Sequence, residues 1–194
     1  LSPCIKTLEK LILPHLQAIL KPKEHQHGFA PKRSTASALD QITNHIAKGF
    51  NNNKPPKRTA LAALDLSKAF DTINHDILIK KLMATTLHKT LVKWLANYLH
   101  GRQATTIYHS TSSSTRNIHS GVPQGSVISP TLFNLYMSDM PTPTHEDSIS
   151  VTYADDITEA ASHVNPHEAC NIPSDYCQQL STWATENHLI FNTQ

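Results

Sequence analysis

Two short apolar runs of this 194-residue chain carry carboxylates at their ends. Residues 59–66 lack a helical period and contain Asp65, and the alternating run 149–153 leads to Asp155 and Asp156. The first pattern predicts a buried strand, and the second predicts a strand that enters a tight turn at Asp155–Asp156. A carboxylate that ends an apolar run is costly unless it is paired or holds a metal ion. The chain must therefore fold so that these charges are satisfied.

Ninety residues separate Asp65 from Asp155, so only the tertiary fold can bring them together. If it does, three hard oxygen ligands converge, a set that suits Mg²⁺ with its preference for one or two carboxylates, phosphates and waters. Adjacent carboxylates also repel each other and raise a pKa unless a cation lies between them. The alternative is that Asp65 caps a local turn and that Asp155 and Asp156 form an ordinary polar turn. For either motif alone, this alternative stays open.

Composition sets wide limits on function. Hydrophobic residues make up 39% and charged residues 16%, which suits a folded core in one domain or two lobes. The formal charge of +2 does not by itself indicate a nucleic-acid binder. The sequence has no stretch of 18 or more apolar residues, so no transmembrane helix is expected. The three cysteines, Cys4, Cys170 and Cys177, form no disulfide framework and indicate a reducing compartment.

The remaining pattern predicts helices with a few strands, and hence an α+β fold. Expected helices cover 6–20, which Pro14 interrupts, 34–50, 76–83 with Asp76 as cap, 88–100, 130–140 and a segment that Ser174 caps. A hairpin is expected over 102–118, an exposed connection over 51–57, and a last short strand over 189–192.

Four segments resemble the motifs of reverse transcriptases. Residues 64–71, LDLSKAFD, look like motif A of LINE elements and group II introns, and residues 153–156, YADD, look like motif C. Residues 121–130, GVPQGSVISP, look like motif B, and residues 27–35, HGFAPKRST, look like the fingers motif that precedes motif A. Order and spacing match over nearly the whole chain, which resembles the catalytic core of a reverse transcriptase from a LINE-type (non-long-terminal-repeat) retrotransposon.

This resemblance implies an RNA-directed DNA polymerase with a right-hand fingers–palm fold, in which an antiparallel palm sheet packs on helices. Residues 1–58 would form the fingers part and residues 59–194 the palm, truncated at both ends and without a thumb. The chain alone is expected to polymerise poorly. In the family, a thumb that grips the duplex and a proton-donating lysine follow the position that corresponds to Gln194, the last residue of this chain.

By the same resemblance, Asp65, Asp155 and Asp156 are the catalytic carboxylates. They would hold two Mg²⁺ ions, with Mn²⁺ as a substitute, and the carbonyl of Leu66 would be an added ligand. Such a pair of ions clamps the attacking and leaving oxygens of a phosphoryl transfer.

Five further residues match positions that bind substrate in the family. Phe70 falls at the steric gate that rejects a 2′-hydroxyl, and its alternative is a core phenylalanine. Gln124 and Gly125 match the nucleotide and template pocket, although Gln124 also fits a plain turn. Lys32 and Arg33 could bind phosphates or form a solvated basic loop, and here Ala30 departs from the arginine frequent in the family.

The implied partners are template RNA, a DNA primer and deoxynucleotides, with no membrane. The implied location is intracellular, in a cytoplasmic ribonucleoprotein and in the nucleus for integration. Two rival hypotheses remain: a reverse transcriptase of the group II intron, retron or telomerase type, and a decayed copy that binds RNA without catalysis.

Overall fold

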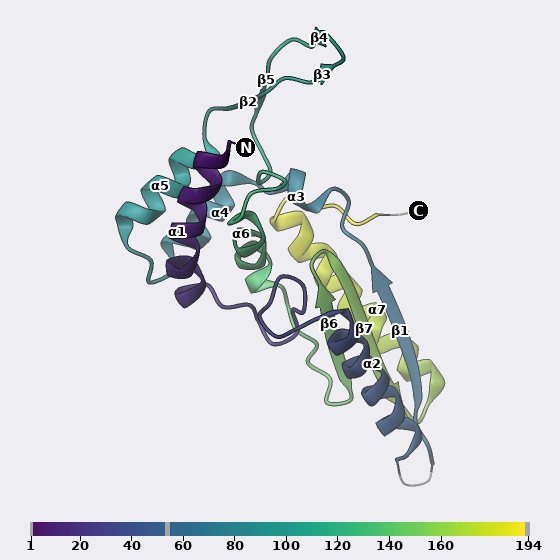
Figure 1. Cartoon of the computed structure of the whole chain (residues 1–194). Helices are drawn as coiled ribbons and strands as arrows, with labels where there is room; N and C mark the ends of the chain where they lie inside the picture. Colours follow the sequence, from purple (N-terminus) through teal and green to yellow (C-terminus); the bar gives the residue numbers. More distant parts are fainter. Residues whose placement is uncertain (1, 53–54, 193–194) are drawn as a thin grey trace. The chain divides into compact units, whose positions relative to one another are not determined.

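The computed structural model of the chain describes residues 2–52 and 55–192 (Figure 1). It forms two compact units, each assembled from two separate stretches of sequence. The first unit comprises Leu1–Lys21 and Lys68–Tyr136, and the second comprises Pro22–Ser67 and Met137–Gln194. The predicted division into fingers (1–58) and palm (59–194) follows the chain order instead, and it stays a prediction.

The second unit is built on a three-stranded antiparallel sheet (Figure 1). Its strands are β1 (Arg58–Leu64), β6 (Ser148–Tyr153) and β7 (Asp156–His163), in the order β1-β7-β6. The helices α2 (Thr35–Phe50) and α7 (Pro166–Glu186) pack against this sheet. The prediction that β1 is buried is wrong, because β1 lies at the edge and Leu61 at its middle is 55% exposed.

The last helix begins earlier than the sequence suggested. Asn165 caps α7 by accepting a hydrogen bond from the backbone N–H of His167, and Pro166 takes the first helical position. Proline is favoured there because the first N–H groups of a helix have no partner inside it. The predicted cap at Ser174 is wrong, because the helix runs through the buried Pro173.

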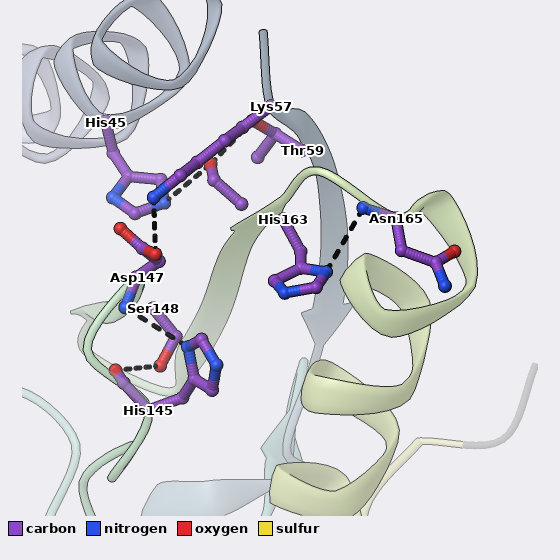
Figure 2. A network of polar contacts seen from close by, with 9 residues as sticks. His45, Lys57, Thr59, His145, Asp147, Ser148, His163 and Asn165 are labelled. Atoms are coloured by element: carbon purple, nitrogen blue, oxygen red, sulfur yellow. Dashed lines mark hydrogen bonds and ion pairs between the residues drawn. The ribbon is translucent and has the colours of Figure 1, made fainter. Parts of the chain in front are cut away.

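A network of polar contacts lies at the end of the sheet opposite to Asp65 (Figure 2). Lys57, just before β1, forms an ion pair with Asp147, just before β6. The pKa of Asp147 is lowered mainly by the hydrogen bond that Lys57 donates. The Ser162 hydroxyl lies 3.0 Å from His45 Nε2 and 2.8 Å from the Thr59 hydroxyl. These contacts tie α2 to the starts of β1 and β6 and the end of β7.

The first unit is mainly helical. Its helices are α1 (Pro3–Ile19), α3 (Ala69–Thr72), α4 (His75–Met83), α5 (Lys89–Leu99) and α6 (Ser129–Tyr136). The predicted hairpin carries two short ribbons, β2 (Arg102–Ala104) with β5 (Arg116–Ile118) and β3 (Ile107–Tyr108) with β4 (Thr111–Ser112). Fully buried leucines from α4, α5 and α6 form the core: Leu78, Leu82, Leu95, Leu99 and Leu132.

The caps in this unit differ from the prediction. Asn74, rather than Asp76, caps α4 by accepting from two backbone N–H groups. Helix α1 continues through Pro14. In the second unit, Met137–Asp139, which the sequence assigned to the helix over 130–140, forms a separate 3-10 turn, η1.

The three cysteines carry free thiols, as expected. Within the described parts of the chain, none of the helices combines the length and the apolar character needed to cross a membrane.

Candidate active site

The pairing of β1 with β7 brings Asp65 and Asp156 together. Leu64 is paired with Ile157 at the end of this antiparallel ladder. Asp65 directly follows Leu64 and Asp156 directly precedes Ile157, and the charge of Asp65 raises the pKa of Asp156. The sheet therefore makes neighbours of two carboxylates that are far apart in sequence.

Asp155 belongs to the loop of the β6–β7 hairpin. Tyr153 pairs with Asp156 across this hairpin, so Ala154 and Asp155 form a two-residue loop. The turn thus lies one residue earlier than predicted, because Asp156 already pairs as the first residue of β7. Ala154 has a φ of 57°, a left-handed conformation that such loops usually give to glycine or asparagine.

The three carboxylates are close enough to repel one another. Partial burial raises the pKa of Asp156, and the charges of Asp155 and Asp65 raise it further. Asp65 and Asp156 are nevertheless exposed, and Asp155 is half-buried. Their electrostatic repulsion is of the kind that a bound cation relieves.

The oxygen-only donor set at this sheet end fits a hard divalent cation. Across residues 2–52 and 55–192, no three or more His, Cys, Asp or Glu side chains converge tightly enough to hold a metal ion. Mg²⁺ does not require such a cage, because it typically binds one or two carboxylates and completes its shell with substrate phosphates and waters. The three carboxylates that were predicted to converge thus lie near one another, but they do not form a closed metal site.

Asp65 is held from its other side by the segment that ends the described chain. The backbone N–H of Asn192 donates to the carbonyl of Asp65 at 2.8 Å, and its side-chain Nδ2 lies 3.3 Å from Asp65 Oδ2. Leu66 faces Phe191 in this isolated antiparallel bridge. The two flanking hydrogen bonds leave the carbonyl of Leu66 directed away from the 190–192 segment. The predicted short strand over 189–192 is present as this bridge.

A groove of about 450 Å³ opens beside the carboxylates. Asp65 and Asp156 line it together with Tyr153 and apolar residues of the sheet. Leu39 and other residues of α2 form its remaining wall. Two of the three predicted catalytic residues therefore share one groove within the second unit.

Lys32 and Arg33 lie in the loop that precedes α2. Arg33 donates through Nη1 to the backbone carbonyls of Lys23 and Gln26, so part of its guanidinium fixes the loop. Lys32 is exposed and has a φ of 60°. A phosphate-binding role remains a prediction for both.

Phe70 and the motif B segment lie in the first unit. The half-buried Phe70 ring stacks on Phe133 with 4.5 Å between centroids and 7° between planes. Gln124 donates through Nε2 to Asp71 Oδ1 at 3.1 Å. The exposed Gly125 has a φ of 80°, which only glycine adopts without strain.

A buried glutamate that the sequence did not reveal holds the motif B segment. Glu9 of α1 is fully buried, and its carboxylate accepts from the N–H of Val127 and from the hydroxyl of Tyr98. Burial and the bond to Glu9 raise the pKa of Tyr98 to about 12. The Tyr98 hydroxyl also lies 3.0 Å from that of Ser126. These contacts fix the chain just after Gln124 and Gly125.

Two other residues near the carboxylates, Asn192 and Gln26, were also not identified from the sequence. Asn192 belongs to an expected strand, and Gln26 directly precedes the fingers motif, so position alone gave a weak signal for each. Neither residue type indicates catalysis without the tertiary contacts.

The chain is similar to known polymerases over its whole length. The sequence profile of the family described as "Reverse transcriptase (RNA-dependent DNA polymerase)" matches residues 1–194. The probable RNA-directed DNA polymerase from transposon X-element of Drosophila melanogaster is 30% identical over 97% of this chain. The RNA-directed DNA polymerase from mobile element jockey of the same species is 31% identical over 97%. The chain spans about a fifth of the length of each, 21%.

A further relative and a solved structure are also similar to this chain. A putative intron protein of Saccharomyces cerevisiae, COX1/OXI3 intron 1, is 29% identical over 71% of this chain and 15% of its own length. The structure of telomerase from Candida tropicalis superposes with a TM-score of 0.62 at 11% identity, covering 97% of this chain and 32% of that one. That likeness shows a shared mixed α/β fold with an antiparallel sheet, as expected. The resemblance to polymerases of LINE-type retrotransposons is confirmed by the transposon relatives. The chain belongs to the reverse transcriptase (RNA-dependent DNA polymerase) family.

Proposed function

We propose that this chain is the nucleotidyl-transfer core of an RNA-directed DNA polymerase of a LINE-type retrotransposon, with fingers and palm parts of a right-hand polymerase. One observation carries the proposal: the pairing of β1 with β7 brings Asp65 close to Asp156, with Asp155 in the adjoining hairpin loop. Family membership over the whole chain supports it.

Each acidic residue has a role in this proposal. Asp65 and Asp156 would bind divalent cations from adjacent strands, and Asp155 would bind from the loop between β6 and β7. The carbonyl of Leu66 would add an oxygen ligand. Bound Mg²⁺, with Mn²⁺ as substitute, would supply charge stabilisation for the attacking and leaving oxygens. Asn192 would keep the Asp65 carboxylate oriented through its amide.

Exchanging one carboxylate for its amide tests the proposal. Asp155→Asn in the polymerase that contains this chain keeps the side-chain shape and removes one negative charge. We expect Mg²⁺-dependent primer extension on an RNA template to fall by about 10²-fold or more, while RNA binding persists. Asp40→Asn, an exposed change on α2, is the matched control and should leave extension unaltered. Full activity of Asp155→Asn would refute the assignment, and RNA binding by an inactive native protein would support the decayed-copy alternative.

Phe70 is proposed to select deoxynucleotides by excluding a 2′-hydroxyl. Its stacking on Phe133 keeps the ring in one orientation, as a steric gate requires. Phe70→Ala should therefore lower the ratio of kcat/KM for deoxynucleotides over ribonucleotides. Phe50→Ala, at an exposed phenylalanine, is the control. An unchanged ratio in Phe70→Ala would mean that Phe70 only packs.

Charge partition supports template RNA and a DNA primer as partners. The first unit holds ten Lys and Arg residues against three acidic ones, whereas the second holds seven against twelve. No Asp or Glu occurs between Asp76 and Asp139. The small net charge of +2 thus hides a strongly basic unit, and basic surfaces supply most non-specific affinity for nucleic acid. A place in a cytoplasmic ribonucleoprotein and in the nucleus, without a membrane, completes the proposal.

A further inference from the structure

The segment His25–Gly28 lies along β6 and ends on the hairpin loop that carries Asp155. The N–H of Thr152 donates to the carbonyl of His25 at 2.8 Å, and the N–H of His27 donates to the carbonyl of Thr152 at 2.7 Å. Gln26 is therefore paired in parallel with Thr152. Its side chain reaches further along β6, to the loop.

The buried amide of Gln26 bonds the backbone of Ala154 on both sides. Its Oε1 accepts from the N–H of Ala154 at 3.0 Å and from the N–H of Gly28 at 2.7 Å, and its Nε2 donates to the carbonyl of Ala154 at 3.1 Å. Gln26 is only 4% exposed. A side-chain amide is suited to this task because it offers an acceptor and a donor at neighbouring atoms.

Ala154 needs such support. Its φ of 57° is unfavourable for a residue with a Cβ, so the loop would relax to other conformations without external bonds. Asp155 and Asp156 directly follow Ala154, so any rotation at Ala154 displaces both carboxylates relative to Asp65. The amide of Gln26 therefore fixes the direction of the loop at the residue where it is least stable.

The supporting segment is itself held in place. A Cβ on Gly28 would lie 2.1 Å from the nitrogen of Ala154, so only glycine allows this contact. Arg33 donates to the carbonyl of Gln26. The buried His27 ring contacts α2 on both edges, with Nδ1 2.7 Å from the Ser37 hydroxyl and Nε2 2.9 Å from Gln41 Oε1.

We infer that Gln26 is a positioning residue for the catalytic loop, acting through Ala154 to set the direction of Asp155 and Asp156. This inference rests on the proposed polymerase function of that site. The side chain of Gln26 bonds the backbone of Ala154 and Gly28, so its effect is on the orientation of the catalytic residues and not on substrate binding.

The test compares Gln26→Met with Gln178→Met. Methionine keeps the length and volume of Gln26 and removes all three hydrogen bonds. Gln178→Met makes the same exchange at an exposed glutamine of α7 and leaves Ala154 untouched. In the full polymerase we expect kcat for deoxynucleotide addition to fall about 10- to 100-fold in Gln26→Met with KM within about threefold, and to change little in Gln178→Met. Should Gln26→Met not fold, Gln26→Asn keeps a polar amide in the buried site and shortens its reach.

A second readout needs no catalysis. Hydrogen exchange of the Ala154 amide, followed by NMR in the chain itself, should become about tenfold faster or more in Gln26→Met. The amides of Ala160 and Ala161 in the same sheet should keep their rates. The inference would be overturned if Gln26→Met left exchange at Ala154 unchanged, or if the native enzyme were active and Gln26→Met had the same kcat. An inactive native enzyme with accelerated Ala154 exchange would instead refute the proposed function and leave the Gln26 contact established.

Discussion

Replacement of Glu159 by glutamine should remove most of the pH dependence of stability between mildly acidic and mildly basic conditions. Glu159 lies on β7, opposite Ala62 of β1 and Ser150 of β6, and is fully buried. Within the described residues, neither of its carboxylate oxygens has a hydrogen-bond partner. Burial raises its pKa from 4.5 to about 8. The folded protein therefore holds a neutral acid at neutral pH.

The sign and size of this pH dependence of stability follow from proton linkage. Above pH 4.5 the unfolded chain releases the Glu159 proton, whereas the folded chain keeps it until about pH 8. Stability should thus fall as pH rises through this window, by at most about 1.4 kcal/mol per pH unit. The whole effect is on the order of 5 kcal/mol, an upper bound because the protein can relax around the charge. Above pH 8 the loss levels off.

Urea unfolding of the chain at a series of pH values measures this effect. Glu159→Gln should match the native chain near pH 5, because a neutral amide resembles a protonated carboxyl, and should be more stable near pH 8.5. Glu24→Gln, at an exposed glutamate of the same unit, controls for the loss of one charge. Parallel pH profiles for the native chain and Glu159→Gln would refute the reasoning.

Three further predictions concern other contacts. Gly28→Ala should lower the free energy of unfolding by about 3 kcal/mol or more in urea titrations, because a Cβ 2.1 Å from the Ala154 nitrogen forces backbone to move; a loss under about 0.5 kcal/mol would contradict this contact. Lys57→Ala should cost less than about 1 kcal/mol at pH 7, since the Asp147 side chain is 37% exposed. That cost should shrink as the pH falls below 3.8, the ordinary pKa of Asp147, because protonation of the carboxylate removes the ion pair; an equal cost at pH 7 and in acid would rule out the ion pair as the cause. Arg116→Ala should reduce the slope of log affinity for RNA against log salt by about 1 if this exposed residue contacts a phosphate, and an unchanged slope would remove it from the interface.

The sequence predicted the elements that depend on local pattern. The helices expected over 34–50 and 88–100 are present as α2 and α5. The strand around Val151 followed from its alternation. Proline was less informative, because Pro14 and Pro173 both lie inside helices whose packing outweighs one lost backbone hydrogen bond.

The contacts around Asp65 and the loop between β6 and β7 could not be predicted in this way. Gln26 bonds Ala154 across 128 residues of sequence, and Asn192 bonds Asp65 across 127. No periodicity or spacing encodes such bonds. Glu9 is a similar case, because its buried carboxylate meets Val127 only after α1 has packed.

Asp65 and Asp156 are exposed, although each lies at the end of an apolar run. An apolar run that ends in Asp65 suggested a charge carried toward the core. In the structure the alternation of strand side chains directs Leu66 and Ile157 inward, at 2% and 1% exposure, while Asp65 and Asp156 face outward from neighbouring positions. The charges thus avoid most of the desolvation cost of a buried carboxylate. What remains is mutual repulsion at a groove open to solvent, and a cation bound there would relieve this repulsion.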